Sequence, residues 1–210
     1  GLTTKEAKNQ AEYWLERFGI QAWRKKRIEE LSKGMAQKVQ FICTVLHEPD
    51  VLILDEPFSG FDPINIELIR KELLNFKKKG KSIIISTHNM NNVEEICDRA
   101  ILINEGHMVL QGTVHDLRQQ FKEGIYKISF IGNMIAFTNA LWAGYEIIDK
   151  EINGEDSFTI YLKMRQGNKI NDLLNAVIND VSITGVEEVL PSMENVFVKS
   201  INAQNEIVSE

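Results

Sequence analysis

The chain has 210 residues, of which 43% are hydrophobic, so it can bury the core of one large domain or two small ones and is not a disordered protein. Its formal net charge of −6 argues against a nucleic-acid partner, which would need a basic surface. No apolar run approaches the length of a membrane span. Cys43 and Cys97 lie in apolar helical stripes, and we expect both to be reduced core residues of a cytosolic protein.

Helices and strands are predicted to alternate through the first part of the chain. Thr3 and Glu6 have the spacing of a capping box and predict the start of a first helix. A second helix follows residues 31–35, and the four aliphatic residues 51–54 then predict a strand buried on both faces. Asp62, followed by proline, predicts the start of a third helix.

The same pattern continues to about residue 110. A second buried strand is predicted at 82–87 and is followed by a short helix. A hairpin is predicted at 101–110, around the turn Glu105-Gly106. Strands that alternate with helices in this way are typical of a layered α/β fold with a parallel sheet.

The remaining residues predict a smaller fold of another kind. Its predicted helices are 134–141 and 170–178, and its predicted strands are 126–131, 145–152, 158–164, 183–190 and a short closing strand at 196–198. This β-α-β-β-α-β order predicts a small α+β ferredoxin-like domain. The segment contains no histidine or cysteine, so we assign it a regulatory or contact role. The predicted domains are therefore 1–122 and 123–202, with a tail at 203–210.

Two adjacent carboxylates, Asp55 and Glu56, follow the first predicted strand. The carboxyl ends of parallel strands form the edge at which α/β folds bind ligands, and consecutive side chains of a strand point in opposite directions. One carboxylate could hold Mg²⁺ while the other orients or deprotonates a water that attacks a phosphate. The alternative is that the acids only end a strand in a polar turn.

Two other segments carry groups that suit a phosphate. Ser32 and Gly34 lie at a helix entrance, where free amides favour an anion and glycine permits close approach. The alternative is an ordinary serine cap with a loop glycine. His88 follows the second buried strand at the same edge as the two acids, and its imidazole could hydrogen-bond a terminal phosphate. A lone histidine is, however, more often structural.

Four segments, in this order, resemble the motifs of the nucleotide-binding domain of ATP-binding cassette (ABC) transporters. Residues 31–35, Leu-Ser-Lys-Gly-Met, resemble the family signature Leu-Ser-Gly-Gly-Gln, and residues 51–56 resemble the Walker B strand. Residues 59–62 resemble the D-loop, and residues 86–88 resemble the switch-histidine segment. The remaining C-terminal part resembles a small domain that is appended to some of these ATPases.

The resemblance implies catalytic roles at the edge of the sheet. Asp55 would help to hold Mg²⁺ through water, and Glu56 would activate the water that hydrolyses ATP. His88 would contact the γ-phosphate of the same ATP. The implied cofactors are thus ATP and Mg²⁺.

The resemblance also implies a second ATPase subunit, in a head-to-tail homodimer or heterodimer. Ser32, Lys33, Gly34 and Met35 would form the signature that contacts the γ-phosphate of the nucleotide held by the other subunit, and Asp62 would couple the two sites. Lys33 replaces a glycine of the consensus and Met35 replaces its glutamine, which leaves the class intact.

The sequence Gly-x-x-x-x-Gly-Lys-Ser/Thr, the Walker A loop that cradles phosphates, does not occur in the 210 residues. The resemblance implies that this loop lies before residue 1. The expected fold is therefore an incomplete P-loop NTPase-type sheet with helices, the C-terminal portion of an ABC ATPase domain, followed by the ferredoxin-like domain. We expect this fragment alone to be inactive, because the lysine and amides that hold the phosphates are missing.

Three functions stay open. The first is the ATP-hydrolysing subunit of an export-type ABC transporter, cytoplasmic and peripheral to the cell membrane, which energises transport through separate transmembrane permease subunits. The second is a soluble ABC-type ATPase that is not coupled to transport, and the third is a non-catalytic regulatory fragment. A single ATPase portion followed by a small β-rich domain, together with the acidic charge, favours the transporter.

Overall fold

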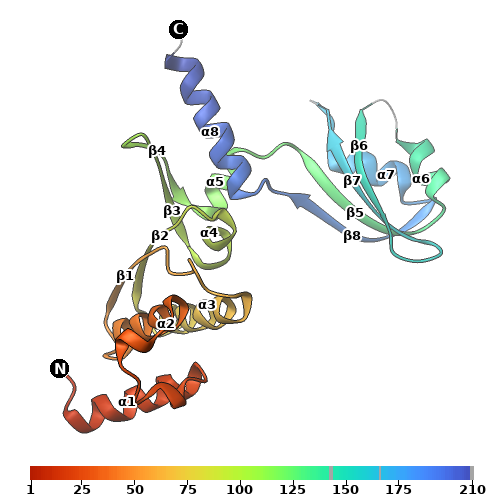
Figure 1. Cartoon of the computed structure of the whole chain (residues 1–210). Helices are drawn as coiled ribbons and strands as arrows, with labels where there is room; N and C mark the ends of the chain where they lie inside the picture. The colour runs from red at the N-terminus through yellow and green to blue at the C-terminus, as the bar shows by residue number, and fades with distance from the viewer. Residues whose placement is uncertain (142–143, 166, 209–210) are drawn as a thin grey trace. The chain divides into compact units, whose positions relative to one another are not determined.

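The chain divides into two units, Gly1–Ile96 and Cys97–Glu210. The computed structural model describes residues 1–141, 144–165 and 167–208 (Figure 1). The division after Ile96 falls ahead of the predicted domain boundary at residue 122, because the hairpin and the helix that follow Ile96 pack with the C-terminal helix. The boundaries predicted from the sequence stay a prediction. None of the helices in the described ranges is long and apolar enough to cross a membrane.

The first unit alternates helices with two strands. In chain order it contains α1 (Thr4–Arg17), the 3-10 turns η1 (Gln21–Trp23) and η2 (Ile28–Glu30), α2 (Lys33–Val45), β1 (Val51–Asp55), α3 (Pro63–Lys78), β2 (Ser82–Ser86) and α4 (Met90–Ile96). Strands β1 and β2 pair in parallel, from Val51 opposite Ser82 to Asp55 opposite Ser86. The predicted order of helices and strands is confirmed.

Capping side chains fix where the helices of this unit begin. The backbone N–H of Thr3 donates to the Glu6 carboxylate at 2.8 Å, and the N–H of Glu6 donates to Thr3 Oγ1 at 3.3 Å. This is the predicted capping box of α1. Asp62 caps α3 by accepting the N–H of Asn65 at 3.0 Å, and Pro63 is the first helical residue, as predicted.

Strand β1 is buried on one face only, so the prediction of burial on both faces is wrong. Leu52 and Leu54 point into the core, whereas Val51 is 55% exposed and Ile53 is 72% exposed. Neighbouring side chains of a strand point to opposite faces, and the described helices of the unit cover one of these faces. A run of aliphatic residues alone does not reveal whether both faces are covered.

Four aromatic rings form the core beside α1, α2 and α3. Trp14 stacks on Phe76 at a centroid distance of 6.2 Å and an interplanar angle of 15°, and Phe18 and Phe41 pack against Trp14. Cys43 lies outside this core: it is exposed, because the buried stripe of α2 consists of residues 41, 42 and 45. The prediction that both cysteines are core residues is wrong for Cys43, and Cys97 is half-buried.

The second unit begins with the predicted hairpin. It comprises β3 (Arg99–Asn104), β4 (His107–Thr113), α5 (Val114–Gln120), β5 (Ile125–Gly132), α6 (Met134–Ala140), β6 (Tyr145–Ile152), β7 (Ser157–Met164), α7 (Ile170–Val177), β8 (Val181–Val189) and α8 (Met193–Val208). Both turn residues of the hairpin have positive φ, 49° at Glu105 and 78° at Gly106, as a tight two-residue hairpin turn requires.

The sheet β6-β7-β5-β8 is antiparallel throughout (Figure 1). In the chain these elements follow one another as β5, α6, β6, β7, α7 and β8, which is the predicted β-α-β-β-α-β order. In the sheet the first strand, β5, lies between the third, β7, and the fourth, β8, and this confirms the predicted ferredoxin-like arrangement. Helices α6 and α7 supply Phe137, Leu173 and Val177 to the buried core of this sheet. Phe130 of β5 stacks on Phe137 with a centroid distance of 4.2 Å and an interplanar angle of 8°.

The predicted closing strand at 196–198 is wrong, because these residues lie inside helix α8. Met193, Val196 and Ser200 are all buried, and their spacing of three and four residues is that of a helix face. The side chain of Ser192 accepts the N–H of Asn195 at 3.2 Å, which caps the start of the helix. Helix α8 also includes residues 203–208 of the predicted tail, whereas 209–210 lie outside the described residues.

Candidate functional site

The carboxyl ends of β1 and β2 bring together the three residues predicted to act on ATP and Mg²⁺. The two strands are parallel and in register, so Asp55 lies opposite Ser86. The Ser86 hydroxyl donates a hydrogen bond to the Asp55 carboxylate. Glu56 follows Asp55, and His88 follows Ser86 by two residues, so both leave the sheet at the same edge. Parallel pairing therefore places these acids and the histidine together.

Glu56 is held tightly at this edge. Its backbone φ is +43°, an unfavourable value for a residue with a side chain, and its N–H donates to the Ser86 carbonyl at 2.9 Å. Its carboxylate lies 2.7 Å from His88 Nδ1 and accepts the His88 backbone N–H at 2.8 Å and the Thr87 hydroxyl at 3.3 Å. Residues in unfavourable backbone conformations cluster at functional sites, where the surrounding contacts keep them in place.

Two opposing effects act on the pKa of Glu56. Burial tends to raise the pKa, but the hydrogen bonds from His88 and Thr87 and the charge of His88 together hold it below the usual value. The carboxylate is therefore ionised at neutral pH and can only accept hydrogen bonds. It follows that His88 Nδ1 carries a proton and donates to Glu56, which leaves Nε2 as the ring nitrogen that can face a ligand.

Magnesium has a suitable oxygen ligand at Asp55. In the described ranges no three His, Cys, Asp or Glu side chains converge as a metal cage. Mg²⁺ does not need such a cage, because it usually keeps several waters and is held by one or two carboxylates and the substrate phosphates. A single carboxylate beside the Ser86 hydroxyl fits that donor set.

The signature segment forms the start of helix α2. Ser32 caps the helix by accepting the N–H of Met35 at 3.4 Å. Ser32 and Lys33 are exposed, while Gly34 and Met35 are half-buried. Within the described part of the chain, no hydrogen bond or ion pair joins this segment to the acids at the sheet edge. The serine cap and a contact with a nucleotide on another subunit are compatible, because the segment lies at the surface.

The Asp62 side chain caps the start of α3 and makes no hydrogen bond to Asp55, Glu56 or His88 among the described residues. Its carboxylate accepts both the backbone N–H and the side-chain amide of Asn65, and these bonds lower its pKa below the usual value. The coupling role implied for Asp62 stays a prediction.

Gln37 is a residue of this region that the sequence analysis missed. Its side-chain amide donates to the carbonyl of Ser59 at 2.8 Å, so the helix that carries the signature also holds the D-loop. Gly60 has a φ of +78°, and a Cβ placed on it would lie 2.6 Å from the Gln37 side-chain oxygen. The only signal in the sequence was a glutamine two residues beyond the signature, which does not indicate its partner.

We expect Gly60→Ala to cost more stability than Gly80→Ala. Both glycines have a φ near +80°, but a Cβ on Gly80 would meet no atom within 4 Å, so only Gly60→Ala pushes Gln37 off Ser59. The expected excess is the value of one hydrogen bond, about 0.5–1.5 kcal/mol. Chemical unfolding followed by circular dichroism measures both variants.

A double-mutant cycle provides the control for that comparison. In a Gln37→Ala background the bond to Ser59 is already absent, so the excess cost at Gly60 is expected to vanish. If both alanine substitutions lowered the free energy of unfolding of the unmodified protein equally, the stabilising role of the Gln37–Ser59 hydrogen bond would be contradicted.

Comparison with known proteins matches a family model to a segment of each unit. A family model described as ABC transporter matches residues 2–59, and a model described as the C-terminal domain of DrrA1-3-like ATP-binding proteins matches residues 112–201. A solved structure titled as the ATP-binding subunit of an ABC transporter aligns with a TM-score of 0.55 and 35% sequence identity, over 58% of this chain and 50% of that one.

Similar curated proteins carry the same description. The uncharacterized ABC transporter ATP-binding protein YhaQ of Bacillus subtilis is 46% identical over 58% of this chain and 41% of its own length. The linearmycin resistance ATP-binding protein LnrL of the same organism is 28% identical over 94% of this chain and 64% of its own length. The chain thus spans less than two thirds of either relative. The chain is similar to ABC transporter ATP-binding proteins in its N-terminal part and to the C-terminal domain of DrrA1-3-like ATP-binding proteins in its C-terminal part.

Proposed function

We propose that the complete protein that carries this chain binds and hydrolyses ATP as the energising subunit of an ABC transporter. The observation that carries the proposal is the ionised Glu56 carboxylate, which His88 and Thr87 hold beside Asp55 at the carboxyl edge of two parallel strands. This edge is where α/β folds bind ligands. An intact acid in an unfavourable backbone conformation argues against a non-catalytic fragment.

The reaction begins with a water positioned by Glu56. The carboxylate accepts a proton from this water while the water oxygen attacks the γ-phosphorus. The bond between the γ-phosphorus and the oxygen that bridges it to the β-phosphate breaks, which releases ADP and phosphate. His88 donates from Nε2 to a γ-phosphate oxygen while Nδ1 donates to Glu56, so the imidazole carries protons on both nitrogens in this complex. Asp55 would hold Mg²⁺ through water, and the bound ion would supply positive charge to the phosphates.

The signature acts on a second subunit. Ser32, Lys33, Gly34 and Met35 are at the surface of the start of α2, where the free amides of a helix favour a phosphate. We propose that they contact the nucleotide of the partner in a head-to-tail dimer, and that Asp62 couples the two ATP sites. The dimer is therefore required for turnover.

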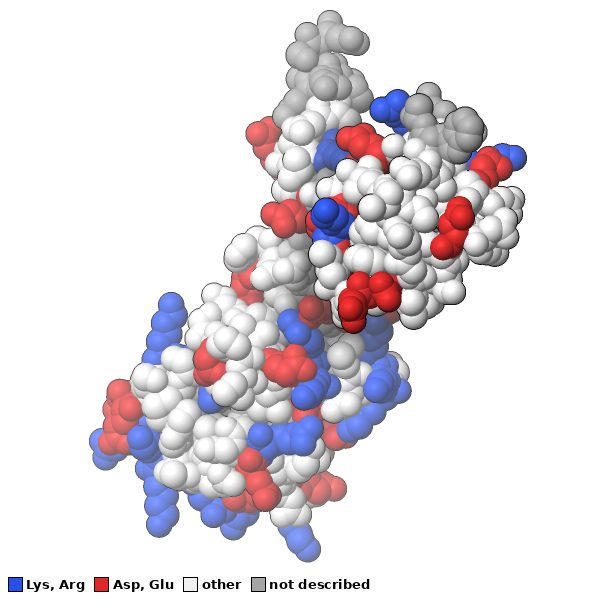
Figure 2. Space-filling model, turned by 90° about the vertical axis from the view of Figure 1, so that its right-hand side faces the viewer, with Lys and Arg blue, Asp and Glu red and all other residues white. Residues whose placement is uncertain are grey.

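Transport requires membrane permease subunits, and we propose that the protein docks on them from the cytoplasm. The match of residues 112–201 to the DrrA1-3-like C-terminal domain and the naming of LnrL as a resistance protein support an export-type system. On the face drawn in Figure 2, acidic and basic side chains are interspersed, which suits a protein partner better than a nucleic acid.

The test is Mg²⁺-dependent release of phosphate from ATP by the complete protein assembled with its permease. We expect hydrolysis that stops when Mg²⁺ is chelated. Asp55→Asn is expected to lower the affinity for Mg²⁺ on the order of 10–100-fold, the usual effect of losing a group that holds a metal ion indirectly. Asp50→Asn is the matched control, because Asp50 precedes the same strand and only pairs with Lys81 at the surface. A complete assembly without ATP hydrolysis would refute the proposed function.

A further inference from the structure

Helix α4 begins two residues after His88, and hydrogen bonds join its cap residue to Glu56. Asn89 caps the helix, because its side-chain oxygen accepts the N–H groups of Asn91 at 3.0 Å and Asn92 at 3.4 Å. The N–H of Asn89 donates to the Thr87 hydroxyl at 3.1 Å, and that hydroxyl donates to Glu56 at 3.3 Å. A displacement of α4 would therefore disturb the groups that hold Glu56 and His88.

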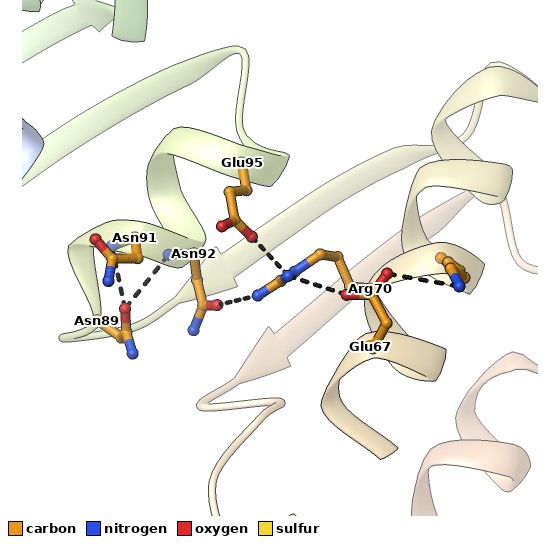
Figure 3. A network of polar contacts seen from close by, with 7 residues as sticks. Glu67, Arg70, Asn89, Asn91, Asn92 and Glu95 are labelled. Atoms are coloured by element: carbon orange, nitrogen blue, oxygen red, sulfur yellow. Dashed lines mark hydrogen bonds and ion pairs between the residues drawn. The ribbon is translucent and has the colours of Figure 1, made fainter. Parts of the chain in front are cut away.

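Arg70 of α3 holds α4 in place (Figure 3). Its guanidinium donates through Nη2 to the side-chain oxygen of Asn92 at 3.4 Å and pairs through Nη1 with Glu95 at 2.8 Å. Glu67, one turn earlier on α3, pairs with the same Nη1 at 3.1 Å and fixes the arginine on its own helix. Asn92 is buried, so its amide depends on protein partners such as this one.

An arginine is suited to this position for a geometric reason. Its planar guanidinium presents several donors in a fixed fork, so it contacts Asn92 and two carboxylates at once. A lysine has a single ammonium and cannot keep the same fork. Helix α3 is the helix that Asp62 caps, so Arg70 joins the helix that starts at the D-loop to the helix that starts at the switch histidine.

We infer that Arg70 is a positioning residue, which fixes α4 on α3 and thereby holds the Glu56–His88 pair in its reactive arrangement. The inference rests on the proposed function for its effect on turnover, but the link between the two helices can be tested without turnover. Because Arg70 acts through α4 and not on the nucleotide, its loss should lower kcat and leave the KM for ATP unchanged.

The experiment compares Arg70→Gln, Arg70→Lys and Lys71→Gln in the complete protein. Lys71 is the matched control, since it also pairs with Glu67 on α3 but makes no hydrogen bond or ion pair to α4 within the described ranges. We expect Arg70→Gln to lower kcat about tenfold with KM within about twofold, Arg70→Lys to recover part of the loss, and Lys71→Gln to match the wild type.

Amide hydrogen exchange followed by mass spectrometry supplies the second measurement. In Arg70→Gln, the amides of residues 89–93 should exchange faster, while those of β1 and of β5 keep the wild-type rate. Unchanged exchange at 89–93, or an unchanged kcat, overturns the inference. Faster exchange across β1 as well, with kcat falling only as the protein unfolds, also overturns it, because Arg70 would then act on stability alone.

The two readouts separate this inference from the proposed function. If the wild-type assembly does not hydrolyse ATP, the proposed function fails. Local acceleration of exchange at 89–93 in Arg70→Gln would still support the helix link.

Discussion

Glu56→Gln in the complete protein is expected to lower kcat for ATP hydrolysis by at least about a hundredfold, since positioned general bases contribute roughly 10²–10⁴-fold. Glutamine keeps the size of the side chain and can still accept the hydrogen bonds from His88 through its carbonyl oxygen, while its NH2 group faces the Thr87 hydroxyl, which can accept. It cannot accept a proton from water. ATP binding should be retained, because the residues that hold the nucleotide are unchanged. Phosphate release and the binding of a fluorescent ATP analogue measure the two effects.

Glu48→Gln is the matched control for this prediction. Glu48 is also a glutamate with positive φ in the first unit, but its φ of 49° lies at a helix end, where its side chain faces Lys79. We expect wild-type turnover from Glu48→Gln. Turnover by Glu56→Gln close to the wild-type rate would show that another group accepts the proton.

Phe137→Ala is expected to destabilise the ferredoxin-like sheet by about 3–5 kcal/mol, the usual cost of removing a buried phenylalanine. Phe137 is fully buried and stacks on Phe130, so alanine would lose this contact and leave a cavity between α6 and β5. Unfolding of a chain with two units need not be two-state, so the free energy is best read from amide exchange in β5 and β7.

Ile135→Ala provides the comparison on the same helix. Ile135 is 67% exposed and lies two residues before Phe137, so its removal should change the exchange of β5 and β7 by less than about 0.5 kcal/mol. Equal effects of the two substitutions would contradict the assignment of Phe137 to the core.

Much of the fold could be predicted because its signals are local. The capping box at Thr3, the Asp62-Pro63 helix start and the Glu105-Gly106 turn each act within four residues, and all three are present. Burial could not be predicted in the same way, because it depends on what packs from elsewhere. The sequence therefore suggested burial for Ile53 and Cys43, which are both exposed.

Residues 196–198 illustrate a second limit. Two of the three are valine, which favours a strand by composition, whereas the helical spacing becomes visible only when Met193 and Ser200 are included. The burial of one face of α8 then decides between the two structures.

The candidate site divides along similar lines. Parallel strands bring their carboxyl ends together, so the meeting of Asp55, Glu56 and His88 followed from the order of the strands. The bonds of Gln37 to Ser59 and of Arg70 to Asn92 did not follow, because they depend on loop backbones and on the rotamers of long side chains.

At Glu56 the left-handed backbone conformation favours glycine for stability, whereas the proposed reaction needs a carboxylate. Glycine would adopt this conformation without strain, so a search for variants of higher thermal stability is expected to favour it there. Such a variant would lack the carboxylate. Selection for robustness alone would therefore remove the acid, and its retention in a working transporter would have to come from the need to cleave nucleotide.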